Sequence, residues 1–163
     1  MKMAVDYGMA LGLPAKSLIV ALLIVQFIGF PAALLLGWMG EKWGPKRGLY
    51  ICLAVYTVVV VHAYFMSRET EFYFLATLIG LVQGGVQALS RSQYAKMSPS
   101  QFSGEYLGFF NMIGKFSTIL GPFLVGTVSW TSGSPRASIL VLLVFFAVGA
   151  TLLRKVDESF AAD

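Results

Sequence analysis

The chain has 163 residues, of which 57% are hydrophobic and 12% are charged, and its mean hydropathy is +0.75. Soluble domains contain about half apolar and about a quarter charged residues, so this composition excludes a soluble enzyme domain of ordinary size. The formal net charge of +4 comes from Lys and Arg residues that lie almost entirely between the apolar runs. That placement indicates orientation in a membrane and argues against nucleic-acid binding.

The chain begins with residues 1–13, which read as the end of a helix whose beginning is missing, so we expect a fragment. The apolar runs that follow predict membrane spans over residues 17–39, 48–66, 72–92, 106–130 and 137–153. A spanning helix needs about 20 apolar residues, whereas strands of a membrane barrel alternate in polarity over about ten. The predicted fold class is therefore all-α, with residues 1–163 forming a single transmembrane domain of about five complete helices and the end of another.

The short segments between these runs alternate between the two sides of the membrane, so their charges predict the orientation. One side collects the basic residues Lys42, Lys46, Arg47, Arg91, Lys96, Arg154 and Lys155. The other side has Lys16, Arg68 and Arg136. Because loops rich in Lys and Arg stay in the cytoplasm, we expect the first side to be cytoplasmic.

The first predicted cytoplasmic loop has the most specific pattern in the chain. Its sequence, GWMGEKWGPKR, resembles the loop signature of the major facilitator superfamily, and the matching positions are Gly37, Glu41, Lys42, Gly44, Lys46 and Arg47. Glu41 stands where Asp is usual. Independently of any family, Gly37 and Gly40 would let a neighbouring helix approach closely, and Gly44 would turn the chain. A generic basic loop is the alternative interpretation.

A second stretch resembles a more specific group of transporters. The segment GGVQALSRS at residues 84–92, followed by GFFN at 108–111 and GKF at 114–116, is similar to bacterial relatives of the vacuolar amino-acid effluxers linked to autophagy. The resemblance covers nearly the whole chain from about Met3. It implies a secondary active transporter of twelve helices in two halves, in which this chain supplies the end of the seventh helix and the eighth to twelfth.

This resemblance also implies the partners and the location. The expected solute is a small organic molecule, with amino acids as candidates, moved by alternating access. The expected partners are the lipid bilayer, the solute and the missing N-terminal half of the same transporter, with no nucleic acid. The expected location is the bacterial inner membrane. A non-transporting membrane scaffold or assembly subunit is the alternative, although it would need no polar cavity.

The distribution of polar residues agrees with that fold without using its motifs. In the superfamily the third and sixth helices of each half are peripheral, and spans 48–66 and 137–153 would occupy these places. They have the least internal polarity. Span 72–92 instead has a polar face formed by Gly80, Gln83, Gly84, Gln87, Arg91 and Tyr94. Span 106–130 has another, formed by Gly108, Asn111, Lys115, Thr118 and Pro122. Three- and four-residue steps place each set on one side of its helix.

Four residues on these faces are the predicted substrate ligands: Gln83, Gln87, Asn111 and Lys115. Lys115 lies roughly 13 Å along its helix from Tyr106, close to the membrane midplane, where an ammonium group needs water, an anion or a carboxylate. In the alternative interpretation, the long side chain of Lys115 snorkels, placing its ammonium group at the membrane surface. The amide side chains of Gln83 and Gln87 could instead form hydrogen bonds between helices. Gly80 and Gly84 are expected to allow close helix packing. Arg91 is expected to be a gate or an anchoring charge.

No cofactor or metal is expected, because Cys52 is the only cysteine and His62 the only histidine. We also expect no enzyme. A membrane-embedded hydrolase would need a Ser/His/Asp set, a zinc-binding pair or paired intramembrane carboxylates, and none of these can be assembled from the sequence.

Overall fold

A computed structural model describes residues 2–10, 12–66 and 68–156 of the chain, and all regular secondary structure in these residues is helical. This confirms the predicted all-α membrane fold class. The helices are α1 (Lys2–Ala10), α2 (Ala15–Trp43), α3 (Pro45–Phe65), α4 (Glu69–Met97), α5 (Ser103–Ser132), α6 (Pro135–Ile139) and α7 (Val141–Lys155), with the 3-10 turn η1 (Ser100–Phe102) before α5.

Helices α2, α3, α4 and α5 are each long and apolar enough to cross a membrane. The fifth predicted span, 137–153, differs from the sequence-based expectation. It is divided between α6 and α7 by one residue, although Leu140 keeps backbone angles in the right-handed helical region. The division lies at Leu140, whose carbonyl accepts from the Leu143 N–H at 3.0 Å. Because this bond closes a tighter turn than that of an α-helix, the regular helix is interrupted there.

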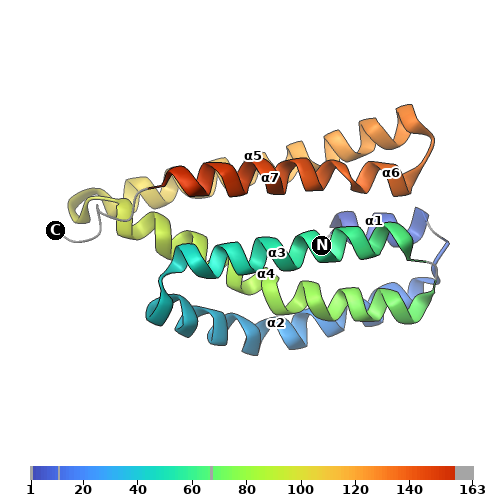
Figure 1. Ribbon diagram of the computed structural model, residues 1–163, viewed down its shortest axis with the longest axis horizontal. Coiled ribbons are helices and arrows are strands. Elements are labelled where there is room, and N and C mark those ends of the chain that lie inside the picture. Colours follow the sequence, from blue (N-terminus) through green and yellow to red (C-terminus); the bar gives the residue numbers. More distant parts are fainter. Residues whose placement is uncertain (1, 11, 67, 157–163) are drawn as a thin grey trace.

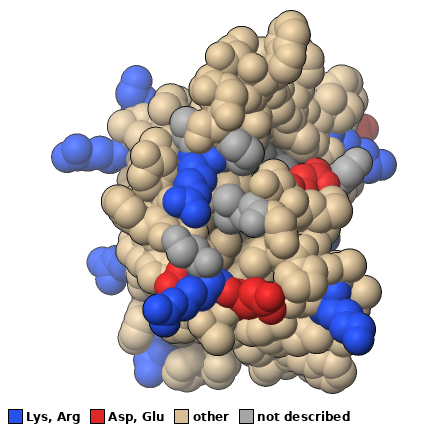
Figure 2. All heavy atoms as spheres, turned by 90° about the vertical axis from the view of Figure 1, so that its right-hand side faces the viewer, with Lys and Arg blue, Asp and Glu red and all other residues tan. Residues whose placement is uncertain are grey.

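The helices form two layers that lie along each other (Figure 1). Helices α2, α3 and α4 make one layer with α1 beside it, and α5 with α6 and α7 makes the other. The α2–α3 turn, the α4–α5 connection and the end of α7 lie at one end of the molecule. The α1–α2 and α5–α6 turns lie at the opposite end, which Figure 2 shows with both acidic and basic side chains.

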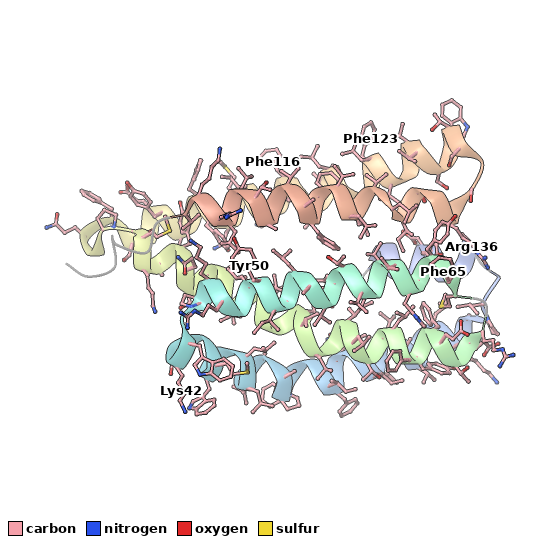
Figure 3. The ribbon with its side chains drawn as sticks, viewed as in Figure 1. Lys42, Tyr50, Phe65, Phe116, Phe123 and Arg136 are labelled. Carbon is pink, nitrogen blue, oxygen red and sulfur yellow. The ribbon has the colours of Figure 1, made fainter. Side chains whose placement is uncertain are left out.

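This arrangement separates the two predicted sets of basic residues. Lys42 and Arg136, one from each set, lie at opposite ends of the helices (Figure 3). The α2–α3 turn carries Lys42, Lys46 and Arg47, and the end of α7 that lies beside it carries Arg154 and Lys155. The charge asymmetry seen in the sequence is therefore an asymmetry between the two ends of the bundle.

Glycines allow the backbones of α2 and α4 to approach closely. A Cβ atom on Gly84 would lie 2.7 Å from the Cβ of Ala33 and 3.1 Å from the carbonyl oxygen of Gly29. A Cβ on Gly80 would lie 3.1 Å from the Cα and the carbonyl oxygen of Val25. The predicted packing role of Gly80 and Gly84 is confirmed, because a Cβ at Gly84 would overlap α2 and one at Gly80 would be tightly crowded by it.

We expect Gly84→Val to lower the thermal midpoint of the purified chain, because the added side chain must push α2 away from α4. Overpacking of this kind costs about 1–3 kcal/mol. The matched control is Gly126→Val on α5, where an added Cβ meets no atom within 4 Å. The comparison is a melting curve in one detergent or lipid. Equal midpoints for the two variants would contradict the close packing of α2 on α4.

The buried core lies in the layer formed by α2, α3 and α4. One cluster contains Leu89, Val82, Leu49 and the fully buried Cys52. A second, larger cluster packs nearer the opposite end, around Phe72. Helices α5 and α7 have no buried residue. The side chains of Phe116 and Phe123 project from the α5 layer (Figure 3), so this surface is available to lipid or to another protein segment.

Candidate functional site

The polar faces of α4 and α5 meet near the end that carries Lys42. Nη2 of Arg91 donates a hydrogen bond to Oδ1 of Asn111 at 3.1 Å. Next to this bond the Tyr94 ring lies against Phe110, with ring centroids 5.0 Å apart, and against Tyr106 at 6.5 Å. Both faces were predicted from residue spacing alone, and the structure brings Arg91 and Asn111 into direct contact.

The local sequence explains why the two helices join at this point. Helix α4 ends at Met97, after which Ser98 and Pro99 take extended backbone conformations. The η1 turn then leads into α5, whose first turn carries Glu105. An acidic residue there is favourable, since the N-terminus of a helix has a partial positive charge. The connection therefore holds Tyr94 and Tyr106 on facing helices close to the turn.

Lys115 lies one turn beyond Asn111 on the same side of α5, about 18 Å along the helix from Ser103. Its side chain is exposed. Across residues 2–10, 12–66 and 68–156 the ammonium group has no hydrogen bond or ion pair, although its own main-chain carbonyl accepts from the Thr118 hydroxyl at 2.6 Å. Lys115 and Arg91 thus extend one cationic face from α4 across to α5.

The two glutamines of α4 have different surroundings. Gln87 is exposed, one turn before Arg91. The side-chain oxygen of Gln83 is instead buried and has no hydrogen-bond partner in the described part of the chain. Gln83 is among the residues that line a largely apolar cavity of about 220 Å³. Gln83 is therefore more enclosed than Gln87, Arg91, Asn111 and Lys115, whose side chains are exposed.

The loop between α2 and α3 shows which parts of its pattern have a structural role. Gly44 has φ of +88°, so it makes the predicted turn in a conformation that favours glycine. Gly40 packs against Leu89 of α4, as expected. The expected close approach at Gly37 is wrong, since a Cβ there would meet nothing within 4 Å. An added methyl group at Gly37 would meet no atom of the described residues, whereas one at Gly40 would meet Leu89.

The charged residues of this loop differ in their contacts. Nζ of Lys42 lies 5.1 Å from the centre of the Trp38 ring, which is a cation–π distance. Glu41 and Arg47 are exposed. Lys46 reaches the end of α7, where its Nζ donates to the carbonyl oxygens of Val156 at 2.5 Å and Arg154 at 3.5 Å.

The sequence alone does not predict contacts of this kind between distant helices. The Tyr50 hydroxyl donates to the carbonyl of Ala150, inside α7, at 3.1 Å. At the other end of α3, the Tyr7 hydroxyl donates to Ala63 O at 2.8 Å and Arg136 Nη2 donates to Met66 O at 3.0 Å. The final carbonyls of a helix need donors. A Lys, Arg or Tyr near a predicted helix end is therefore the sequence feature that could indicate such a contact. The partners cannot be identified without the tertiary arrangement.

Nothing in the described residues forms a metal site, since no group of three His, Cys, Asp or Glu side chains could hold an ion. Asp6 and His62 are exposed. The His62 ring lies edge-on to Phe74, with ring centroids 6.1 Å apart. What the exposed face offers chemically is therefore two cations, amides and aromatic rings, a set that suits the binding of a carboxylate or a zwitterion.

Comparison with known proteins agrees with this fold. Residues 6–162 match the family model described as "Vacuole effluxer Atg22 like". The chain is 35% identical over 161 residues to the MFS-type transporter YxiO of Bacillus subtilis, which covers 99% of this chain and 38% of YxiO. It is 34% identical over 92 residues to autophagy-related protein 22-1 of Phaeosphaeria nodorum, covering 56% of this chain and 16% of that protein.

No solved structure matches the chain. The chain spans well under half the length of these curated relatives. The match to the family model extends over nearly all of it, from α1 to beyond α7. The chain therefore belongs to the family of proteins that resemble the vacuole effluxer Atg22.

Proposed function

We propose that this chain is part of a secondary active transporter that moves a small organic solute by alternating access. In this proposal the chain rocks against the N-terminal half of the same transporter, and solute binds near the membrane midplane between them. Membership of the effluxer-like family and the similarity to an MFS-type transporter support transport as the activity. Amino acids are the proposed solutes, since they carry the carboxylate that the exposed cations suit.

The observation that supports this function best is the cationic face shared by α4 and α5. Arg91 is bonded to a neutral amide, Asn111, and Lys115 has no carboxylate beside it in the part of the chain that the structure describes. A charge on a spanning helix needs compensation, and a bound carboxylate would supply it. We propose Lys115, Asn111 and Gln87 as solute ligands and Arg91 as the gate at the cytoplasmic end. Gln83 stays a predicted ligand, although its side-chain oxygen is buried.

Transport by a hybrid protein tests this function. In the hybrid transporter, this chain replaces the matching segment of YxiO, and the protein is reconstituted in vesicles preloaded with amino acids. We expect saturable exchange of at least one labelled amino acid. A hybrid that inserts and folds yet exchanges no member of a panel covering acidic, basic and neutral amino acids would contradict the proposed solute class.

We propose that the α2–α3 turn faces the cytoplasm, in a bacterial inner membrane. The basic residues gathered at that end support this orientation.

Labelling of a single cysteine measures the orientation. We expect Lys42→Cys to be unreactive to an impermeant maleimide in intact cells and reactive once the cells are opened, because the native Cys52 is fully buried. Arg136→Cys, at the opposite end, is the matched control and should react in intact cells. Labelling of position 42 from outside would overturn the orientation.

A further inference from the structure

We propose that an anionic phospholipid binds at the seam where the α2–α3 turn meets the end of α7 (Figure 1). Lys46 joins these two segments, because its Nζ donates to the main-chain carbonyls of Arg154 and Val156. Arg47 follows Lys46 in the turn, and Arg154 and Lys155 are the last two residues of α7. The Lys46 bonds therefore bring Arg47, Arg154 and Lys155 into one region, and we call these three residues the seam cations.

The seam cations have no acidic partner among the described residues. All three side chains are exposed, and none forms a hydrogen bond or an ion pair with another residue that the structure describes. Glu41, the only acidic residue described in the α2–α3 turn, is offset by its neighbour Lys42. Positive charges held in one region repel one another, and a bound anion removes that repulsion. The seam therefore favours an anionic partner.

Two tryptophans place this seam at the depth of lipid headgroups. Trp38 and Trp43 lie near the end of α2 and leave 59% and 51% of their surface exposed. Trp side chains gather at the membrane–water interface of spanning helices. The Lys42 ammonium lies over the Trp38 ring, so a cation and an aromatic ring are paired at this depth. Because Arg47 follows Trp43 closely in the turn, the seam cations are level with lipid phosphate groups.

The seam provides the groups that bind phosphate well. Two N–H donors of one guanidinium match two oxygens of a phosphate, and a lysine adds a point charge. Near an anionic membrane surface each Lys or Arg strengthens binding about fivefold. A zwitterionic headgroup also carries a cationic amine, which the seam cations repel, so an anionic phospholipid is the better occupant. The seam lies on α3 and α7, whereas the proposed solute face lies on α4 and α5, so neither proposal depends on the other.

Native mass spectrometry of the whole chain in detergent, titrated with phosphatidylglycerol or phosphatidylcholine, tests the proposal. We expect saturable binding of phosphatidylglycerol to the wild-type chain and weaker binding of phosphatidylcholine. Arg47→Gln and Arg154→Gln should each weaken binding of phosphatidylglycerol about fivefold, and the double variant about twenty-five-fold. The controls are Lys96→Gln, at the same end on α4, and Lys16→Gln, at the opposite end. Each removes one exposed cation and should leave the affinity unchanged.

Several results would overturn the proposal, provided that the buried Cys52 stays protected from a thiol reagent and so shows that each variant is folded. One is equal affinity for phosphatidylglycerol in wild type and the double variant, and another is equal binding of the two lipids. A loss in Lys96→Gln or Lys16→Gln as large as in Arg47→Gln would show a general effect of charge. Displacement of phosphatidylglycerol by an equal concentration of inorganic phosphate would assign the seam to a soluble anion.

The sequence after α7 supplies one more test. Asp157 and Glu158 follow the seam cations in the sequence and lie outside the described residues. We expect the wild-type chain to bind phosphatidylglycerol with both carboxylates in place. Binding that is seen only when Asp157→Asn and Glu158→Gln are combined would show that these carboxylates compensate the seam cations, and the proposal would then be wrong.

Discussion

Lys115→Met is expected to abolish or sharply weaken exchange by the hybrid transporter while leaving expression and membrane insertion intact. Truncating one partner of a buried charge pair costs about 2–5 kcal/mol, which corresponds to a loss of about thirtyfold or more in kcat/KM. The change cannot act by blocking insertion, because removing the charge makes insertion easier by about 2.5–3.5 kcal/mol. Exchange rates in vesicles, normalised to inserted protein, measure the effect.

Two further variants separate solute binding from a general need for positive charge. Lys115→Arg should restore exchange only in part, because the planar guanidinium is larger and forms hydrogen bonds in a fixed fork. Lys96→Met removes an exposed lysine near the end of α4 and should be close to neutral. Full exchange by Lys115→Met would show that the lysine only snorkels to the surface, and the glutamines would then be the better ligand candidates.

The second prediction concerns transport by this chain without the other half of the transporter. We expect vesicles that contain only this purified chain to show no saturable uptake, since a site between two halves cannot be completed by one of them. Most residues of α5 are exposed and none is buried, which agrees with a face that another segment covers. Saturable uptake by the chain alone would require a homodimer or another architecture.

The sequence was sufficient for the fold class because continuous apolar runs of this length have one stable form in lipid, the helix. It also predicted the two polar faces that carry Arg91 and Asn111, since three- and four-residue spacing defines a helix face. The hydrogen bond between these two residues was found only in the structure. The close approach at Gly80 and Gly84 followed from side-chain size alone. Each of these inferences needs only local geometry.

The features that were missed depend on which helices are neighbours. Lys46 was interpreted through the loop pattern, whereas its contacts are with the end of α7, more than a hundred residues away in sequence. Gly37 fits the same pattern, but a Cβ there would meet no atom of the described residues within 4 Å. The interruption at Leu140 could not be predicted, because no Gly or Pro stands at or next to that residue. Gln83 and Gln87 looked equivalent on the helix face, and only the tertiary arrangement shows that the side-chain oxygen of Gln83 is buried.

We infer that the face shared by α4 and α5 borders water and contacts solute in the transporter, and the reactivity of Asn111→Cys reports on both properties. In the hybrid transporter without other exposed cysteines, we expect an impermeant thiol reagent to label position 111, and a saturating exchanged amino acid to slow that labelling. The control is Val144→Cys on the exposed face of α7. We expect lipid to cover that face, so position 144 should stay unlabelled by a reagent dissolved in water. If position 111 is as unreactive as position 144, or if solute does not change its rate of labelling, then this face is not a water-filled solute site.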